Sequence, residues 1–584
     1  MKRLAAALDR ARMSRSRIAK EQAIGAALRA IAADGDPVAL ATAARMAGGR
    51  LLAAGDGRSL GVGWSLMADA MRTATGWHDE VLFACARKTG ELAEAFGLLA
   101  RRIEGVEQRP GIALAAVAEL ADRLASASGR AVKSAMLDDA FRRTTPLETK
   151  YLAKALGGGM RIGAVEGVVH GAIARAFDAP IDAVRQAAAL VTDLGDLAIL
   201  ARDARLDQAR LTVGKPAAFK LAVPIETLAG SIDPSAYVLE DKIDGVRAQV
   251  HRTADGEVAI FARGLDRVTD AFPEVVAAVR SLDGAAVLDG EIVALGAAGR
   301  PRPFQALQPR LKRQRPSAED LAEVRVTLVA FDLLVDASGT LLDRPWSERR
   351  ARLLALVPAS APDAGIVVNP ATPIPASLPL AEALDAAFTA ARERGHEGLV
   401  LKRADAAYDA GRRGQAWIKV KRAHATLDVV VVAAQEGHGR RAGALSDYTF
   451  AVWRDDELVP VGKAYSGLTD DEIEAMTRRF DALTIERQGG MRIVRPEVVL
   501  EVAFDGLQRS DRHTSGFALR FPRIVRIRDD KTPAEADQLA TVEALFEAQV
   551  AGGHRESKPS ASKRSRKKRT PSSQLSLFDP HKKT

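Results

Sequence analysis

Residues 240–247 read Glu-Asp-Lys-Ile-Asp-Gly-Val-Arg and place Lys242 among carboxylates at the end of an apparent strand. Taken alone, the stretch is better explained as a surface ion-pair cluster before a turn, because short motifs often match by chance. Further segments follow it in order, and an ordered series is far rarer by chance than one motif. They are Arg263 in IFARG, Glu291 in LDGEIV, Phe331 in AFDLL, Glu397 in EGLVLK, Lys419 and Lys421 in WIKVK, and Arg528, Asp530 and Lys531 in RFPRIVRIRDDK.

The sequence on both sides of this stretch predicts a mixed α/β domain over residues 206–423. Val/Ile-rich runs such as EVAIFARG and VTLVAFDLLV are separated by Gly and Asp, which is typical of strands and turns, and helical stretches such as DAFPEVVAAVRSL lie between them. Over residues 424–545 the texture changes. Segments such as LDVVVVAAQE and PEVVLEVAFDGLQ alternate like half-buried strands, which predicts a small β-barrel.

The two ends of the chain differ from this middle part. Residues 1–205 are rich in Ala, Leu and Arg, with apolar residues spaced three and four apart as in GIALAAVAELADRLASA, and this spacing predicts an all-α domain. Residues 546–584 are rich in Ser, Lys, Arg and Pro and too polar to bury a core, so we expect a disordered basic tail. The chain is therefore predicted to be a multidomain protein.

Composition excludes several classes of protein. Hydrophobic residues make up 47% and charged residues 27% of the 584 residues, which excludes collagen-like and wholly disordered chains. Charges interrupt every long apolar run and are spread through the N-terminal segment, so we expect no membrane span, no export signal and a cytoplasmic, nucleoid-associated protein. The single cysteine, Cys85, permits neither a disulfide framework nor a cysteine-rich zinc site.

Basic charge is concentrated near the C-terminus. The formal net charge is +9, and residues 552–584 carry ten Lys and Arg against two acids, so the rest of the chain is nearly neutral. The tail is a non-specific polyanion binder by composition. Nucleic-acid binding by the rest of the chain must come from segregated basic faces.

The ordered series, together with KYLAKALGGGMRIG in the helical region, resembles the ATP-dependent DNA ligases of the long form. The Lys-x-Asp-Gly element alone would also fit RNA-capping enzymes and RNA ligases. The resemblance covers about residues 1–545. It implies a helical DNA-binding domain over 1–205, an adenylation domain of the nucleotidyltransferase (ATP-grasp-like) fold over 206–423 and an OB-fold domain over 424–545, before the tail at 546–584.

The resemblance also implies a reaction. The Lys242 amine would attack the α-phosphate of ATP and form lysyl-AMP, adenylate would pass to the 5′-phosphate at a nick in duplex DNA, and the 3′-hydroxyl would then seal the strand. A lysine amine is a nucleophile only when unprotonated, and its ordinary pKa is about 10.4, so it needs cationic neighbours or a metal ion. Lys419, Lys421 and Mg²⁺ (or Mn²⁺) would supply them. Lys419 and Lys421 share one face of a strand because side chains alternate with period two.

Roles for the other side chains follow from the same resemblance. Glu240 would accept the adenine amino group, Phe331 would stack on adenine, and Arg247 would contact the nucleotide or the nick phosphate. Arg263 would hold phosphate, and Glu291 would hold the ribose or a metal-bound water.

The remaining charged residues complete the expected site. Glu397 would be the main magnesium carboxylate, since Mg²⁺ needs few protein ligands. Arg413, in GRRGQ, is a further nucleotide or DNA contact. A last group would swing over the site with its domain and orient the leaving pyrophosphate: Arg528, Asp530 and Lys531.

Each of these residues has a simpler explanation when taken alone. Glu240 and Arg247 would form an ordinary ion pair, Phe331 would be core, and Glu397 would be a helix-end acid. The others would be charges at strand ends or on a solvated basic edge: Arg263, Glu291, Arg413, Lys419, Lys421, Arg528, Asp530 and Lys531. Their joint order favours the ligase site.

Two further segments suggest binding partners. Gly157–Gly159 with Arg161 would let backbone amides approach DNA phosphates, although a glycine cluster is also an ordinary helix end. Near the C-terminus, Gln574, Leu575, Leu577 and Phe578 look like the short peptide by which bacterial DNA enzymes dock on the sliding clamp. A chance apolar patch is the alternative explanation.

Other functions stay open at this point. Another lysine nucleotidyltransferase, such as an RNA ligase or capping enzyme, is disfavoured by the helical domain. An NAD-dependent ligase is disfavoured because its cysteine zinc site cannot be built here. A non-catalytic DNA-bridging or clamp-tethered scaffold would not require the intact Lys242, Glu291, Glu397 and Lys419. The resemblance to the DNA ligases implies a monomer that encircles nicked DNA.

Overall fold

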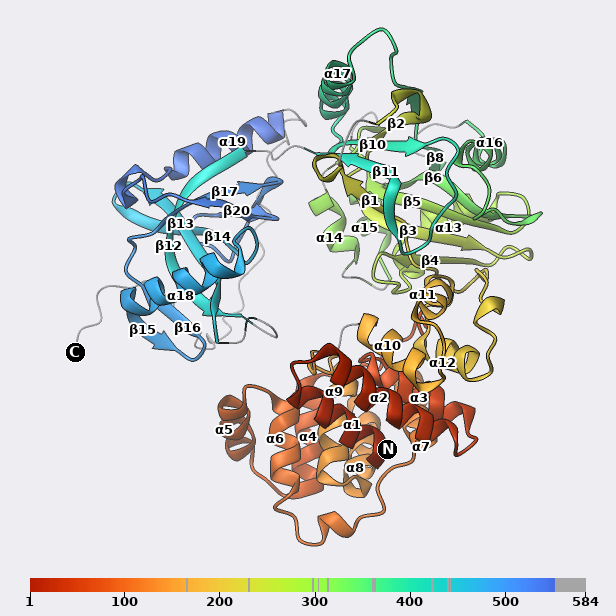
Figure 1. Cartoon of the computed structure of the whole chain (residues 1–584), viewed down its shortest axis with the longest axis vertical. Helices are drawn as coiled ribbons and strands as arrows, with labels where there is room; N and C mark the ends of the chain where they lie inside the picture. The colour runs from red at the N-terminus through yellow and green to blue at the C-terminus, as the bar shows by residue number, and fades with distance from the viewer. Residues whose placement is uncertain are drawn as a thin grey trace.

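The computed structural model describes residues 1–163, 166–228, 232–296, 299–302, 304–311, 313, 315–359, 364–421, 425–437, 441 and 443–551. Within these ranges the chain forms a helical part, a mixed α/β part and a sheet-rich part, in that order from red to blue in Figure 1. This order confirms the predicted architecture of an all-α region followed by α/β and β-rich regions. No helix in the described ranges is both long and apolar enough to cross a membrane.

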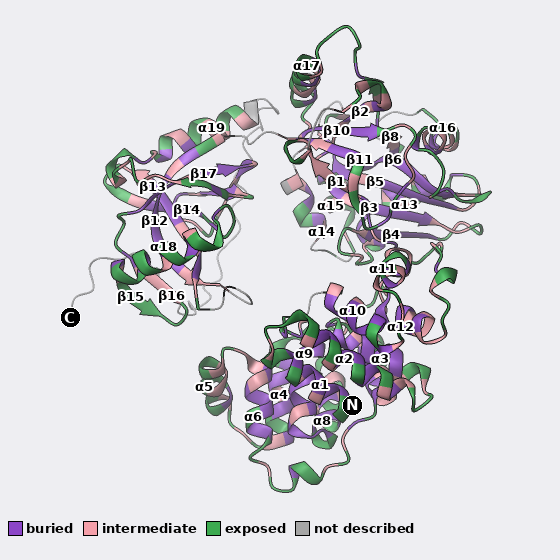
Figure 2. Ribbon diagram, viewed as in Figure 1, coloured by how far each residue is buried: buried purple, intermediate pink, exposed green. Residues whose placement is uncertain are grey.

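The N-terminal part is a bundle of short helices around an Ala/Leu-rich core, which Figure 2 shows as a buried interior. Polar caps fix several helix starts: Asp36 accepts the backbone N–H groups of Val38 and Ala39, and Thr145 and Glu148 form a capping box. The helices are α1 (Lys2–Met13), α2 (Arg17–Ala32), α3 (Pro37–Ala47), α4 (Trp64–Thr75), α5 (Asp79–Thr89), α6 (Leu92–Ala100), α7 (Leu114–Ser126), α8 (Arg130–Arg143), α9 (Pro146–Leu156), α10 (Glu166–Ala176), α11 (Ile181–Leu190) and α12 (Leu194–Arg202).

The α/β part contains two sheets. One has the strand order β1-β11-β10-β2-β9; the other has the order β4-β3-β5-β6-β7, with β8 parallel to β6. The strands are β1 (Leu221–Pro224), β2 (Tyr237–Lys242), β3 (Val246–Arg252), β4 (Val258–Ala262), β5 (Ala286–Ala294), β6 (Val326–Asp336), β7 (Gly339–Thr340), β8 (Ile366–Val368), β9 (Ala371–Pro373), β10 (Gly398–Arg403) and β11 (Arg413–Val420). The helices are α13 (Pro273–Arg280), α14 (Gln308–Leu311), α15 (Ala318–Glu323), α16 (Trp346–Leu356) and α17 (Leu380–Glu393).

Two glycines hold the strands of the second sheet close together. A Cβ atom on Gly245, between β2 and β3, would lie 2.3 Å from the backbone oxygen of Ile292 on β5. A Cβ atom on Gly290 would lie 2.8 Å from the backbone oxygen of Val329 on β6. No side chain larger than the hydrogen atom of glycine fits at such distances, so these two positions require glycine.

The segment that joins the helical and α/β parts is held against β3 by hydrogen bonds. The Gln249 side chain accepts the N–H of Ala217 at 2.9 Å and donates to its carbonyl at 3.1 Å. His251 Nδ1 accepts the N–H of Gly214 at 3.1 Å. Because both β3 side chains are buried, these hydrogen bonds fix the path of the next residues, Phe219 and Lys220.

The C-terminal part is a curled sheet. Strand β12 pairs with β13 along one edge and, along the other, with β17 in its first half and β16 in its second half, so the sheet bends around it. The elements are β12 (Ala425–Glu436), β13 (Leu445–Arg454), β14 (Glu457–Ala464), α18 (Asp470–Leu483), β15 (Thr484–Gln488), β16 (Met491–Val494), β17 (Val499–Phe504), β18 (Gly506–Arg509), β19 (Phe517–Arg520), β20 (Arg523–Ile527) and α19 (Leu539–Ala551).

The C-terminal part touches the α/β part through the ends of the β18–β19 hairpin. Arg520 forms an ion pair with Asp244 at 3.2 Å, and Asp505 lies 3.4 Å from Lys421. The backbone N–H of Asp505 donates to the carbonyl of Arg520 at 2.9 Å, which holds these two residues side by side. The contact therefore reaches the segment that follows Lys242.

Candidate active site

Lys242 is the last residue of β2, as the sequence predicts, and its ammonium group pairs with Glu397. The N–H of Glu397 donates to the Lys242 carbonyl at 2.8 Å, so the backbone holds the two residues together where β2 and β10 meet. Lys421, just after β11, approaches the same carboxylate at 2.9 Å. The Lys242 side chain is 24% exposed, so substrate can reach it.

The charges around Lys242 perturb one another. Burial favours the neutral form of Glu397, but Lys242 and Lys421 outweigh it and hold the pKa of this carboxyl at about 2. Burial lowers the pKa of Lys421, whereas Glu397 and Asp505 raise it above its ordinary value. Partial burial and the nearby charges of Lys421 and Lys242 lower the pKa of Lys419. The predicted lysine cluster is thus present.

Glu291 lies on β5 directly opposite Arg247 on β3. Desolvation raises the pKa of Glu291 to about 7 even though Arg247 and Lys242 act against it, and the charge of Glu397 adds to the rise. Glu291 and Glu397 are therefore close enough to repel each other when both are ionised. A divalent cation between or beside them would remove that cost.

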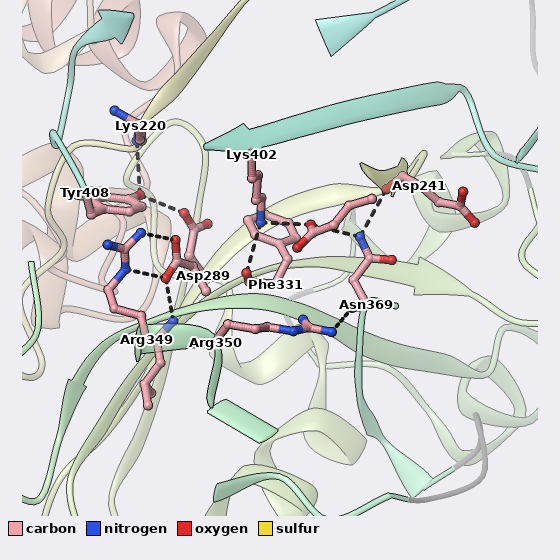
Figure 3. Close-up of polar contacts among 12 residues, drawn as sticks. Lys220, Asp241, Asp289, Phe331, Arg349, Arg350, Asn369, Lys402 and Tyr408 are labelled. Carbon is pink, nitrogen blue, oxygen red and sulfur yellow. Dashed lines mark hydrogen bonds and ion pairs between the residues drawn. The ribbon is translucent and has the colours of Figure 1, made fainter. Parts of the chain in front are cut away.

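Glu240 is buried at the other end of the site. Its Oε2 atom accepts from Lys402 Nζ at 2.8 Å and from Asn369 Nδ2 at 3.2 Å, while Oε1 finds no hydrogen-bond partner among the described residues. Lys402 also donates to the Phe331 carbonyl at 2.9 Å, and Asn369 donates to the Asp241 carbonyl, as Figure 3 shows. A buried acceptor without a donor fits a ligand that brings an N–H group.

Phe331 lies beside Glu240 in an aromatic and cationic cluster. Its ring is 8% exposed and makes an edge-to-face contact with Trp417, with centroids 5.8 Å apart. Lys402 Nζ lies 4.4 Å and the Arg247 guanidinium 4.8 Å from its centroid. Phe331 thus has the packing of a core residue and a place next to the predicted nucleotide site.

Some predicted residues lie at the margin of this cluster. Arg263 is exposed in the turn after β4, and Arg413 is exposed at the start of β11, where its charge still lowers the pKa of Lys419. The last predicted group forms a separate cluster on the C-terminal part, where both basic residues pair with Asp428, at 2.9 and 2.7 Å: Arg528, Asp530 and Lys531. The structure does not bring this group to Lys242.

Several site residues escaped the sequence analysis: Lys220, Asp289, Asn369, Lys402 and Tyr408. A lysine in the otherwise apolar run GLVLKR and an aspartate in AAVLDG were the available signals, since charges are rarely buried unless paired. Asn369 and Tyr408 carry no such signal. Their function depends on contacts that only the fold reveals.

The metal expectation rests on Glu291 and Glu397. Within the described ranges there is no cluster of three or more His, Cys, Asp or Glu side chains placed to hold a metal ion. Mg²⁺ often uses one or two carboxylates, retained waters and substrate phosphates, so two repelling carboxylates are a donor set that fits it.

The helical part presents a glycine-rich turn. Gly158 has a positive φ of 72°, and a Cβ atom on Gly158 or Gly159 would meet open space. Arg161 follows with a φ of 47° and an exposed side chain. The indole of Trp64 rests against Gly157. Open backbone beside an exposed arginine is suited to anions.

A partly exposed lysine whose carboxylate partner also contacts a second lysine is an arrangement suited to nucleotidyl transfer. Comparison with known proteins agrees. Residues 1–174 match the family "DNA ligase N terminus", residues 218–421 match "ATP dependent DNA ligase domain" and residues 441–531 match "ATP dependent DNA ligase C terminal region".

Individual relatives cover nearly the whole chain. A probable DNA ligase of Koribacter versatilis is 41% identical over 86% of this chain and 89% of its own length. A DNA ligase of Natronomonas pharaonis is 37% identical over 87% of this chain and 93% of its own. The solved structure named Pmar-Lig_PreS3 has the same fold, with a TM-score of 0.52, 17% identity and coverage of 90% and 99%. The chain belongs to the ATP-dependent DNA ligase family.

Proposed function

We propose that this ATP-dependent DNA ligase seals 5′-phosphate/3′-hydroxyl nicks in duplex DNA through lysyl-AMP and a DNA-adenylate, with Lys242 as the nucleophile. The observation that carries the proposal is the partly exposed Lys242 ammonium on Glu397, with Lys421 on the same carboxylate. Nearby positive charge neutralises the phosphates of a bound nucleotide.

In the first step the Lys242 amine forms a bond to the α-phosphorus of ATP, and the bond to pyrophosphate breaks. Lys419 and Lys421 hold the phosphates; partial burial and the nearby charges of Lys421 and Lys242 lower the pKa of Lys419. Arg263 and Arg413, both exposed, supply further phosphate contacts. Catalysis of this kind depends on positioning and charge neutralisation.

The base lies at the Glu240 end of the site. Glu240 Oε1, which lacks a donor among the described residues, accepts from the adenine amino group. Phe331 stacks on the base, and Arg247 contacts the nucleotide or the nick phosphate. Glu291 binds the ribose or a metal-bound water.

Glu397, with Glu291 beside it, would hold Mg²⁺ or Mn²⁺, which supplies positive charge to the phosphates when bound. Binding there would exchange the Lys242–Glu397 ion pair for metal coordination. Desolvation raises the pKa of Glu291 and the nearby charge of Glu397 adds to the rise, which supports this assignment.

The C-terminal part acts as a mobile OB-fold domain. Arg528, Asp530 and Lys531 orient the leaving pyrophosphate only after this domain turns toward Lys242, because their partner in the structure is Asp428 of the same domain. Domain rotation between steps is an established way to assemble a site for one step and release it for the next.

DNA is held by the whole chain, which acts as a monomer. The helical domain, residues 1–205, contacts phosphates without reading bases, through Gly157–Gly159 and Arg161. The adenylation domain covers 206–423 and the OB-fold domain 424–545, before the basic tail at 546–584. Residues 574–578 of that tail, which lie outside the described residues, dock on the bacterial sliding clamp.

The test is nick sealing on a labelled duplex with Mg²⁺ and either ATP or NAD, comparing the full chain with Lys242→Ala. We expect ATP-dependent joining and a trapped AMP adduct that both disappear in the variant. An AMP adduct without joining would mean another lysine nucleotidyltransferase; neither product would mean a scaffold. Deleting residues 574–578 should leave sealing intact and abolish co-elution with the clamp.

A further inference from the structure

Arg247 belongs to a closed ring of hydrogen bonds. Its Nε and Nη2 atoms donate to the two Asp289 oxygens, both at 2.7 Å, and Nη2 also donates to the Lys220 carbonyl at 3.3 Å. The Lys220 N–H donates to the Tyr408 hydroxyl at 3.0 Å, and that hydroxyl donates to Asp289 Oδ2 at 2.6 Å. Figure 3 shows Lys220, Tyr408 and Asp289 joined in this order.

The ring is buried, and three aromatic rings enclose the guanidinium. Its central carbon lies 5.3 Å from the Phe219 centroid, 4.8 Å from that of Phe331 and 5.2 Å from that of Trp417. Asp289 and Tyr408 are almost fully buried. A buried carboxylate keeps its charge only when its hydrogen bonds are satisfied, so every member of the ring constrains the others.

One nitrogen of Arg247 is left for substrate. Nη1 makes no hydrogen bond to any described residue, and 20% of the side chain is exposed. The bidentate pair with Asp289 fixes the plane of the guanidinium and therefore the direction of its Nη1–H bonds. Glu291, opposite Arg247 on β5, lies on the same side as the nucleophile cluster.

We infer that Tyr408 is a positioning residue that aims Arg247 Nη1 at a substrate phosphate, through Asp289 and the backbone of Lys220. This inference rests on the proposed function. The Tyr408 ring stacks edge-to-face on Trp417 at 5.8 Å, so Tyr408→Phe keeps that packing and removes only the hydroxyl. Asp289 and the Lys220 N–H then each lose a partner, so the carboxylate that fixes the guanidinium plane is held less firmly.

The ring also ties the active site to the connecting segment. Lys220 follows the residues that Gln249 and His251 hold against β3, and its Nζ pairs with Asp409 at 3.0 Å. A displacement of this segment therefore reaches Arg247 through two main-chain atoms. Because only the backbone N–H and carbonyl of Lys220 belong to the ring, a substitution of its side chain would leave these hydrogen bonds in place.

The experiment is a double-mutant cycle of Arg247→Ala and Tyr408→Phe on the full chain, with self-adenylation and nick sealing measured separately in single-turnover reactions. Tyr408→Phe should slow the step that Arg247→Ala slows, by about tenfold at saturating substrate, because the phosphate still binds but is misplaced. In the Arg247→Ala background the same change should cost less than about twofold.

Tyr237→Phe is the matched control. Tyr237 lies in the same domain, and its hydroxyl also donates one hydrogen bond, to the Gln415 carbonyl at 3.0 Å. Both tyrosine variants should lower Tm, Tyr408→Phe by more because its hydroxyl has two partners, but only Tyr408→Phe should change the rate. If the rate reductions caused by Arg247→Ala and Tyr408→Phe multiply in the double variant, the inference is overturned. It is also overturned if Tyr237→Phe slows the step as much as Tyr408→Phe does. A wild-type chain that forms no AMP adduct would instead overturn the proposed function.

Discussion

Two clusters of lysines and carboxylates lie in different domains of this chain, and they differ in how completely they are closed. In the helical domain, Lys154 is fully buried and contacts Glu91 and Glu94, and Lys150 contacts Glu94 and Asp9 at 2.9 and 2.8 Å. In the adenylation domain, Lys242 and Lys421 share Glu397, yet both side chains stay about a quarter exposed.

The difference separates charge that builds structure from charge that performs chemistry. In the helical cluster each buried ammonium group has two carboxylate partners, as burial of a charge requires. In the proposed catalytic cluster Lys242 and Lys421 share Glu397, Lys421 also lies 3.4 Å from Asp505, and both lysine side chains are about a quarter exposed. Burial raises the pKa of a further carboxylate, Glu291, to about 7. Because the charges of this second cluster are not fully paired with one another, we expect them to bind phosphates and a metal ion.

The largest effect is expected from Lys242→Ala. Loss of the nucleophile should reduce AMP-adduct formation and sealing by more than about a thousandfold, while Glu397 keeps Lys421 as a partner and Tm changes little. Adduct trapping and thermal unfolding measure the two quantities. A variant that still forms an adduct would show that another residue is the nucleophile.

Lys154→Ala should produce the opposite pattern. Removing Lys154 leaves Glu91 without its ion-pair partner, while Glu94 keeps Lys150, so the free energy of unfolding should fall by about 3–5 kcal/mol. Urea unfolding measures the loss. Adduct formation per folded molecule should stay at the wild-type value, since this cluster lies outside the adenylation domain. A slower reaction in folded Lys154→Ala would erase the distinction between the two clusters.

The two clusters should also respond to pH with opposite signs. The pKa of Glu291 is raised from 4.5 to about 7 in the folded chain, so its contribution to stability is present below about pH 4.5 and is lost as pH rises through 7. Between pH 5 and pH 8 the free energy of unfolding of Glu291→Gln should therefore rise by about 2 kcal/mol relative to that of wild type.

Glu94 provides the matched comparison. Burial raises its pKa, but Lys150 and Lys154 outweigh this and lower it, so its stabilising contribution is present above the unfolded pKa and is lost as pH falls through the folded pKa. Glu94→Gln should thus be most destabilising near neutral pH. Urea unfolding at several pH values measures both variants, and equal signs for the two would contradict the assignment.

The smallest effect is expected from Asp505→Asn, at the contact between the C-terminal and α/β parts. Lys421 keeps Glu397, but loses a partner 3.4 Å away, so its pKa should fall slightly. We expect self-adenylation to change by no more than about threefold, because partly exposed ion pairs contribute little. The pH–rate profile of self-adenylation measures the shift, and a profile identical to wild type would remove Asp505 from the catalytic cluster.

Much of the fold and part of the site could be predicted from the sequence. The change from helical spacing to strand alternation predicted the three regions, and Lys242 stands at a strand end as expected, because local pattern determines such features. The position of Arg528 away from Lys242 could not be predicted, since it depends on which orientation the domains adopt.

The hydrogen-bond ring around Arg247 was equally invisible. Tyr408 is 188 residues from Lys220 and 119 from Asp289, and two of the ring's atoms belong to the Lys220 backbone, which carries no side-chain signal. Asp289 and Lys402 could have been noticed as charges in apolar runs. Their partners Arg247 and Glu240 could not, because each lies on a neighbouring strand that is distant in the sequence, and strand pairing is a property of the tertiary fold.

The close approach at Gly245 has a consequence for sequence drift. The main chain at Gly245 abuts the Ile292 carbonyl on β5, and that at Gly290 abuts the Val329 carbonyl on β6. Backbone contact rather than side-chain volume therefore sets how closely the segment after Lys242 approaches β5, and how closely β5 approaches β6. Apolar residues elsewhere in these sheets are then free to exchange volume without changing the catalytic register. In a combinatorial library that varies the apolar core and keeps both glycines, we expect stability to vary while the turnover rate stays nearly constant.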